Sequence, residues 1–276
     1  MIRASARKTQ TAGRELVIAL HCSGAGAAQW GRLAEALGGT YELIAPEHYG
    51  CDRTGPWTGD HAFTLADEAA RTIALIDGND RKVHLVGHSY GGGVALHVAL
   101  ARPDRIASLT LYEPSAFYLL RQFGPRAAAA FAEIRSIANR TGAGIATGDY
   151  RSAAATFVDY WSGPGAWDAL RPAVQDGLAR WAAKAPLDFA ALIDEPTSVS
   201  AYARLSCPTL VIRGEHAPAP TRIIADTLPS LLPHARLVIV TGAGHMGPLT
   251  HAAEVNALIA PHIAERVARR LPRAAA

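Results

Sequence analysis

A serine flanked by glycines is the first feature of this 276-residue chain that could carry out chemistry. Gly87, Ser89 and Gly91 form the pattern G-x-S-x-G, which follows the apolar run 83–86 and opens a helix-like stretch near Gly92. A serine at such a strand–turn–helix corner needs strained backbone angles, and side chains in place of the glycines would collide with the strand and the helix. The free N–H groups of the helix start would favour an oxyanion there. The pattern predicts a nucleophilic serine, and the alternative is a tight turn with an inert one.

A histidine in a glycine-bounded stretch is the best candidate for the base. His245 is one of eleven histidines, and it lies in residues 241–248, directly after the last predicted strand. A loop of this kind can bring a neutral imidazole to the serine hydroxyl, whose proton it must accept. His216, His234 and His251 show no paired spacing of metal ligands and are interpreted as surface residues. We therefore expect His245 to be the base and expect no metal site.

Short apolar runs alternate with longer helix-like stretches along most of the chain. The runs are apolar on both faces, as expected of buried strands in a parallel sheet. The alternation predicts an α/β fold, with right-handed crossovers that place helices on both faces of the sheet. The predicted strands are Leu16–Leu20, Tyr41–Ala45, Val83–Gly87, Ser108–Glu113, Thr209–Gly214 and Arg236–Gly242, and the predicted helices are Ala28–Leu37, Leu65–Asp77, Gly92–Arg102, Thr221–Leu232 and His251–Arg270.

One segment interrupts this alternation. Residues 116–203 have helical composition and Gly/Pro turns, and they hold 12 of the 19 aromatic residues, while their eight basic and eight acidic residues cancel. Many aromatics without net charge favour a lid over an apolar pocket. The alternative is that its three tryptophans only attach the segment to the core. We expect an α/β core made of residues 1–115 and 204–276, with a helical cap at 116–203.

Together these motifs resemble those of the α/β-hydrolase-fold family, in particular the small serine hydrolases with a helical cap. The resemblance covers nearly the whole chain and is strongest at GHSYGG (87–92), at HCSG (21–24) and at Gly244-His245. It implies a mostly parallel sheet flanked by helices, with the cap inserted after the strand that the family counts as its sixth. It also implies a Ser–His–acid triad in the chain order nucleophile, acid, histidine. A serine nucleophile argues against haloalkane dehalogenase or epoxide hydrolase chemistry, which uses aspartate at this point of the fold.

The resemblance also implies an oxyanion hole. Its two donors would be the backbone N–H of Tyr90 and that of Ser23, in the loop after the first strand. Cys22 stands where the family usually has a glycine. Nothing in the sequence marks the Cys22 thiol as activated, so it is interpreted as a small packing residue.

The acid of the triad departs from the family pattern. Relatives usually supply an aspartate shortly after the strand that ends here at Gly214, but Ala217 occupies that position and no aspartate follows until Asp226. Glu113 is favoured, because it ends a strand at the carboxyl edge, where active sites of parallel sheets gather. Glu215 is the alternative acid. The third possibility is that neither serves, which would favour a non-catalytic member of the fold.

Composition excludes several classes of protein. A hydrophobic content of 49% and a net charge of +3 exclude a disordered chain, and the chain has no apolar run of about 18 residues that could span a membrane. The first 16 residues lack the apolar stretch of a secretory signal, so we expect a cytoplasmic protein. The three cysteines are scattered without a CxxC motif, which argues against a disulfide framework or a structural zinc site. The one basic cluster, at the end of the chain, fits a solvated helix end rather than a nucleic-acid surface.

The leading hypothesis is a serine hydrolase that cleaves an ester, thioester or lactone of a small, mainly apolar substrate through an acyl-enzyme on Ser89. It implies no cofactor, and its only expected partner is a small-molecule substrate, without nucleic acid or membrane. One alternative is a carbon–carbon bond hydrolase with the same triad. The other is a non-catalytic ligand-binding protein of the same fold, favoured by the missing aspartate. The identity of the substrate and the choice between monomer and homo-oligomer stay open.

Overall fold

The computed structural model describes residues 14–51 and 53–270, with side chains up to residue 265. Six strands in this part of the chain form one sheet in the order β2-β1-β3-β4-β5-β6. Every neighbouring pair is parallel, so the predicted α/β class with a mostly parallel sheet is confirmed. The strands are β1 (Glu15–Leu20), β2 (Tyr41–Ile44), β3 (Val83–His88), β4 (Ile106–Tyr112), β5 (Thr209–Gly214) and β6 (Ala235–Val240).

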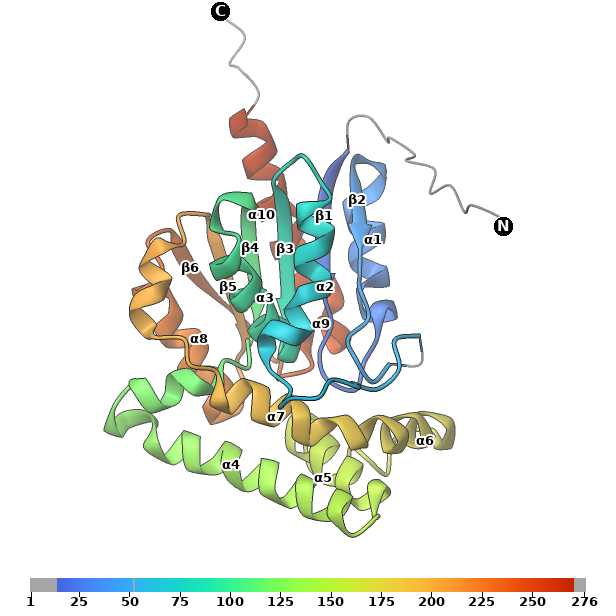
Figure 1. The fold of residues 1–276 in the computed structure, drawn as a ribbon. Helices are drawn as coiled ribbons and strands as arrows, with labels where there is room; N and C mark the ends of the chain where they lie inside the picture. The colour runs from blue at the N-terminus through green and yellow to red at the C-terminus, as the bar shows by residue number, and fades with distance from the viewer. Residues whose placement is uncertain (1–13, 52, 271–276) are drawn as a thin grey trace, which may run out of the picture.

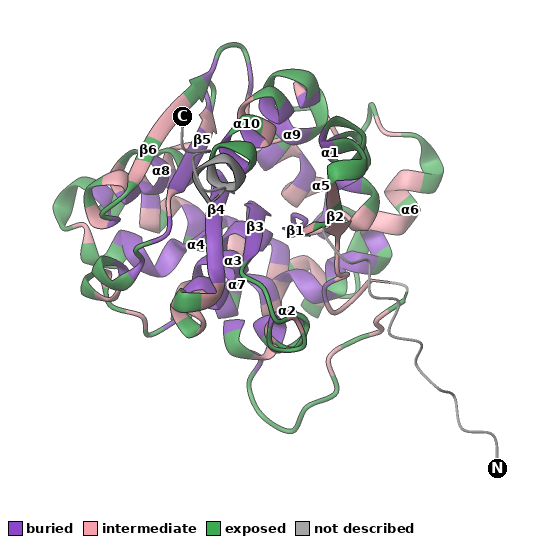
Figure 2. Ribbon diagram, turned by 90° about the horizontal axis from the view of Figure 1, so that it is seen from above, coloured by how far each residue is buried: buried purple, intermediate pink, exposed green. Residues whose placement is uncertain are grey.

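Strand residues are apolar on both faces because the sheet separates two cores. In β1, Leu16, Ile18 and Leu20 pack on one face, while Val17 and Ala19 pack on the other. Successive side chains of a strand point to opposite faces, so a continuous apolar run fills both cores at once. Figure 2 shows the result, with the central strands buried and the outer surfaces of the helices exposed.

Helices cover both faces, as the alternation of patterns predicts. The α1 and α10 helices pack on the face that holds Val17, and α2, α3 and α8 pack on the opposite face. Predicted ends differ from observed ends by up to three residues, the largest difference being at α1, where the 3-10 helix η1 occupies the predicted start. The α3 helix begins two residues earlier than predicted, at Tyr90, with Ser89 as its N-cap. These core helices are α1 (Gly31–Leu37), α2 (Leu65–Asp77), α3 (Tyr90–Ala101), α8 (Ala219–Leu231), α9 (Gly247–Thr250) and α10 (Ala252–Arg270), with 3-10 helices η1 (Ala27–Trp30), η2 (Gly38–Thr40) and η3 (Pro103–Arg105).

A helical segment joins β4 to β5. Its helices lie across the carboxyl ends of the strands, below the sheet in Figure 1. Parallel sheets bind ligands at that edge, so the segment lies where it can cover a site. Its helices are η4 (Phe117–Gln122), α4 (Pro125–Ala146), α5 (Tyr150–Ser162), α6 (Pro172–Trp181), η5 (Ala182–Lys184), α7 (Ala185–Asp194) and η6 (Val199–Arg204).

Two expectations from composition concern the surface and the chain end. No helix of the described residues combines the length and the apolar character that crossing a bilayer requires. The basic cluster at the end of the chain lies outside the described side chains, which stop before it.

Candidate active site

Ser89 lies at a sharp corner between β3 and α3. Its φ of 54° and ψ of −118° are unusual for a residue with a side chain and store strain on the order of 1–3 kcal/mol. The flanking glycines are needed for close packing: a Cβ on Gly87 would lie 2.5 Å from the carbonyl oxygen of Gly91, and one on Gly91 would lie 2.4 Å from that of Leu20. The corner therefore has the form that G-x-S-x-G predicts, and it presents Ser89 at the carboxyl end of the sheet.

A line of hydrogen bonds joins the serine to a histidine and a carboxylate. Ser89 Oγ lies 2.8 Å from His245 Nε2, and His245 Nδ1 lies 2.7 Å from Glu113 Oε2. All three residues are buried. With Nδ1–H donating to the carboxylate, Nε2 carries the lone pair and can accept the serine proton. The structure thus brings together Ser89, His245 and the favoured acid, Glu113.

The Glu113 carboxylate is held by two groups besides the histidine. The backbone N–H of Gly214 donates to Oε1 and the hydroxyl of Thr221 donates to Oε2, each at 2.9 Å. Glu113 follows β4 with a φ of 41°, and its own N–H donates to the carbonyl of Ile212. This left-handed turn ends the strand and directs the side chain toward His245. Fixed donors of this kind keep a carboxylate oriented.

The alternative acid lies elsewhere. Glu215 is exposed, and its Oε2 accepts a hydrogen bond of 2.9 Å from the backbone N–H of Gly242. Ala217, at the position where relatives carry aspartate, is buried. The structure therefore does not bring Glu215 to His245, and the Glu113 carboxylate is the one that meets the imidazole.

The loop that carries His245 is held by contacts on two sides, one with the core and one with the helical segment. His88 Nε2 donates to the carbonyl oxygen of His245 at 2.9 Å, and Gln29 Nε2 donates to His88 Nδ1 at 3.1 Å. Burial, followed by the nearby His245 ring, lowers the pKa of His88 well below its usual value, so this imidazole stays neutral. On the other side, the ring of Trp161 lies over the His245 ring at a centroid distance of 4.2 Å. These contacts fix the orientation of the base.

The predicted oxyanion residue Ser23 follows β1, whereas Glu113 follows β4, and these two strands flank β3 on its two sides in the sheet. The other predicted oxyanion residue, Tyr90, directly follows Ser89. Ser23, Ser89 and Tyr90 border a small space of about 10 Å³, which is room for about one water molecule. The Ser23 hydroxyl is not available to bind an oxyanion, because it donates to Asp188 Oδ2 at 2.6 Å. The expected donor is the backbone N–H of Ser23. Burial raises the pKa of the neighbouring Cys22 thiol to about 12, which agrees with a packing role.

A larger cavity opens beside Ser89 and His245. Its volume is about 290 Å³, and most of its wall comes from apolar side chains of α5, of residues 170–178 and of residues 246–249. The aromatics of the helical segment divide between two roles, because Phe157 and Trp161 line the cavity whereas Trp167 packs against other residues of the segment. The remaining apolar wall residues are Val158, Leu170, Val174, Leu178, Met246 and Leu249.

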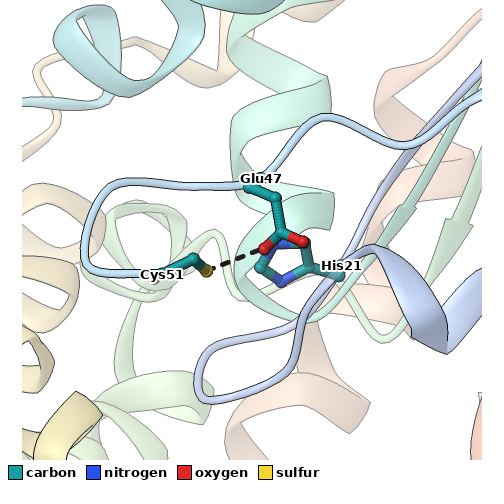
Figure 3. Close-up of side chains that lie close together, drawn as sticks. All are labelled: His21, Glu47 and Cys51. Atoms are coloured by element: carbon teal, nitrogen blue, oxygen red, sulfur yellow. Dashed lines mark hydrogen bonds and ion pairs between the residues drawn. The ribbon is translucent and has the colours of Figure 1, made fainter. Parts of the chain in front are cut away.

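One cluster behind the first loop has side chains of the types that hold metals. The ligand atoms of His21, Glu47 and Cys51 all lie within 4.8 Å of one another (Figure 3). Each is already engaged: His21 Nε2 accepts the backbone N–H of His48 at 3.2 Å, Glu47 pairs with Arg53 at 2.7 Å, and the Cys51 thiol bonds the Glu47 carboxylate. Burial lowers the pKa of His21 to about 3, and burial together with Glu47 raises that of Cys51 to about 12. The cluster is therefore a hydrogen-bonded support for the first loop.

Sequence reasoning did not find the residues that hold these groups. Thr221 and Gln29 bond the acid and His88, and they lie in helical stretches without any motif. Lys184 and Asp188 lie in the helical segment. Lysine occurs just three times in the chain, but no motif marks either residue. Such residues act through contacts that the fold creates between distant parts of the chain.

The parallel sheet, the serine corner and the adjoining histidine define a protein of the α/β-hydrolase class. The model of the alpha/beta hydrolase family matches residues 17–258, so the chain belongs to this family. Lipase LipV of Mycobacterium tuberculosis is 40% identical over 87 residues, which are 31% of this chain and 32% of LipV. Polyketide synthase ThaQ of Burkholderia thailandensis is 30% identical over 225 residues, which are 79% of this chain and 10% of ThaQ.

The chain thus spans a third or less of the length of these relatives. Among solved structures, a hydrolase from Pseudomonas aeruginosa PA01 has a TM-score of 0.74, with 24% identity and 91% of each chain covered. At this level of identity the likeness concerns the fold.

Proposed function

We propose that this chain is a serine hydrolase that cleaves an ester, thioester or lactone of a small, mainly apolar substrate. The observation that carries the proposal is the buried line from Glu113 through His245 to Ser89, which ends at the wall of an apolar cavity. This arrangement of an acid, a base and a nucleophile is the one that activates a serine hydroxyl in unrelated folds. The names of relatives, such as a lipase, are compatible with acyl chemistry.

In the first half-reaction, His245 Nε2 takes the proton of Ser89 Oγ as that oxygen attacks the substrate carbonyl. The tetrahedral oxyanion rests on the backbone N–H groups of Tyr90 and Ser23. The Glu113 carboxylate, hydrogen-bonded to Nδ1, stabilises the imidazolium. The bond to the leaving alcohol, thiol or enol then breaks, and the imidazolium returns the proton to the leaving atom.

In the second half-reaction, a water molecule takes the place of the leaving group. His245 removes a proton from the water as its oxygen attacks the acyl-enzyme, and the same two N–H groups hold the second oxyanion. Collapse of this intermediate breaks the bond to Ser89 Oγ, which regains its proton from His245. The products are a carboxylic acid and the free enzyme, and the cycle needs no cofactor.

The wall of the cavity favours an uncharged substrate. Its described lining has no lysine, arginine, aspartate or glutamate, and a charged group would lose its hydration there without gaining a partner. An anionic dienoate, the kind of substrate on which the carbon–carbon bond hydrolases act, fits this lining less well than a neutral ester or lactone. We further propose that residues 116–203 form the cap over this cavity, that residues 1–115 and 204–276 form the core, and that the protein is cytoplasmic.

Labelling with a fluorophosphonate tests the activated serine. The reaction forms an Oγ–P bond and releases fluoride, so intact mass should show one adduct on the wild-type protein and none on Ser89→Ala. Ser115→Ala is the matched control, because Ser115 Oγ lies only 3.2 Å from Ser89 Oγ and is equally buried. It should keep the adduct.

A panel of p-nitrophenyl esters, thioesters and lactones then identifies the substrate class, and kcat of Ser89→Ala should fall on the order of a million-fold. A folded wild-type protein without an adduct or turnover would contradict the proposal and favour the non-catalytic binding protein. Turnover of a dienoate without ester hydrolysis would favour the carbon–carbon bond hydrolase.

A further inference from the structure

A buried ionic cluster adjoins the predicted oxyanion residues, because its Asp188 borders the same small space as Ser23, Ser89 and Tyr90. Lys184, from the helical segment, places Nζ 2.7 Å from Glu68 Oε2 and 2.5 Å from Asp188 Oδ1. The three residues expose 5%, 2% and 4% of their surfaces. Removing three charges from water is costly, so such a cluster is weak evidence for stability alone. Its place next to the site raises the question of what it holds.

The side chains of both predicted oxyanion residues are hydrogen-bonded to this cluster. The Ser23 hydroxyl donates to Asp188 Oδ2 at 2.6 Å, and the Tyr90 hydroxyl donates to Glu68 Oε2 at 2.8 Å. Lys184 bridges the two carboxylates and also lies 3.4 Å from the Tyr90 hydroxyl. The two residues whose backbone N–H groups would bind the oxyanion are therefore joined through their side chains by one ammonium group.

The bridge is held firmly in place. Tight packing surrounds the stem of Lys184, since a Cβ on Gly50 would lie 2.7 Å from Lys184 Cδ. Its ammonium lies 4.6 Å from the centre of the Tyr90 ring. Burial lowers the pKa of Lys184, but attraction to Asp188 and Glu68 outweighs burial and leaves this pKa above its ordinary value. The ammonium is therefore charged at neutral pH.

We infer that Lys184 is a positioning residue that sets the relative placement of the two oxyanion donors, Ser23 and Tyr90. The inference rests on the proposed function. The two donors belong to different elements, the loop after β1 and the start of α3, and misplacement by a fraction of an ångström weakens hydrogen bonds to a developing charge. The helical segment thereby takes part in the chemistry, because it supplies Lys184 and Asp188.

If the Lys184 bridge only attached the helical segment to the core, its loss would change the binding of ligands in a different way. Loss of packing or closure would reduce the binding of every ligand in the cavity. Loss of donor placement would reduce only the stabilisation of tetrahedral species, because the trigonal ground state interacts less with the oxyanion hole. Transition-state and ground-state ligands therefore separate the two roles.

Lys184→Met is the direct test, because it keeps an unbranched stem and removes the charge. With an activated ester, kcat should fall about 10- to 100-fold, somewhat less than for full loss of a donor, while KM stays within about twofold of the wild-type value. The inhibition constant of an alkyl boronic acid, which forms a tetrahedral adduct on serine, should rise by the same factor as kcat falls. That of the corresponding alkyl methyl ketone should not change. Lys82→Met, at an exposed position, is the matched control.

A folded Lys184→Met variant with wild-type kcat, or one that loses affinity equally for both inhibitors, would overturn the inference. If this variant does not fold, Ser23→Ala and Tyr90→Phe replace it, because each keeps its backbone N–H and loses only the link to the cluster. Each should lower kcat and boronic acid affinity together, by about tenfold. Unchanged values in both variants would overturn the inference as well.

The same variants give a test of coupling. In a background of Ser23→Ala and Tyr90→Phe, adding Lys184→Met should cost less than about twofold more in kcat, because the bridge no longer has anything to position. A full second loss would contradict the inference. Wild-type labelling by the fluorophosphonate separates the two proposals: without labelling the proposed function fails, whereas with labelling and an unaffected Lys184→Met only the role of Lys184 fails.

Discussion

The two sides of Ser89 are supported by different parts of the molecule. On one side, which we call the acid–histidine side, the hydrogen bonds of Glu113 and His245 within the described residues all go to groups outside the helical segment, including Gly214 and Thr221. On the other, the oxyanion side, Ser23 and Tyr90 depend on a cluster that includes Lys184 and Asp188 of the helical segment.

This difference separates activation of the serine from stabilisation of the oxyanion. The helical segment meets His245 through the ring of Trp161, by packing, and meets Ser23 through a hydrogen bond. One path crosses between the sides: the Cys22 N–H donates to Gln29, which donates to His88, which donates to the His245 carbonyl. Changes in the segment should therefore impair the oxyanion side first.

The largest expected effect lies on the acid–histidine side. Glu113→Gln keeps the shape of the side chain but removes the charge that stabilises the imidazolium, so kcat should fall about 10,000-fold. Glu215→Gln is the matched control and should stay within about twofold of wild type, as expected for an exposed residue. Steady-state kinetics on one activated ester measures both. If Glu215→Gln lowered kcat more than Glu113→Gln, Glu215 would be the acid of the triad. The comparison between the two sides would then no longer hold.

Acid should weaken the support of both sides. Burial lowers the pKa of His21 to about 3 and also lowers that of His88, whereas both take up protons near pH 6.5 when unfolded. Stability from these neutral rings is therefore complete above about pH 6.5 and is lost as the pH falls, toward pH 3 for His21. Each ring adds up to about 1.4 kcal/mol per pH unit to the slope of the free energy of unfolding against pH.

Urea unfolding at several pH values between 7 and 5 gives this slope. In His21→Gln, the slope should decrease by the contribution of one ring relative to wild type. An identical slope in the two proteins would mean that His21 takes up protons as readily in the folded state as in the unfolded state, and the buried neutral support described here would be wrong.

The smallest effect sharpens the comparison within the acid–histidine side. Thr221→Val removes one of the two core donors to Glu113 and leaves the Gly214 N–H in place. A hydrogen bond to a charged group is worth about 1.5–3 kcal/mol, so kcat should fall about tenfold. Thr227→Val is the matched control in the same helix, since the Thr227 hydroxyl donates to the carbonyl of Ile223. Equal rates in the two variants would show that Gly214 alone orients the acid.

Periodicity was sufficient for the fold because strand and helix patterns are local. The first strand, predicted at Leu16–Leu20, is found at Glu15–Leu20. Ser89 and His245 could be singled out because their glycine-rich surroundings are needed by their backbones. The choice between Glu113 and Glu215 stayed open, because the direction of a side chain at a strand end depends on backbone angles such as the positive φ of Glu113.

The supporting residues could not be predicted at all. Thr221 meets Glu113 across 108 positions of the chain, and Lys184 meets Glu68 across 116. No local pattern marks such pairs, because only the finished packing creates them. The same holds for the cavity wall, whose shape depends on how the helical segment settles on the core.

The connection from β4 to the helical segment has a consequence for modular exchange. Glu113 donates its N–H to Ile212, and Ser115 donates its N–H to the carbonyl of Ser89, so the three residues from Glu113 to Ser115 are fastened to the core at both ends. If a foreign helical segment replaced the native one from the end of β4 onward, the Glu113 carboxylate would be lost together with the native segment. The natural splice point is therefore after Ser115. Recombination upstream of it would introduce a new pocket but remove the acid of the triad.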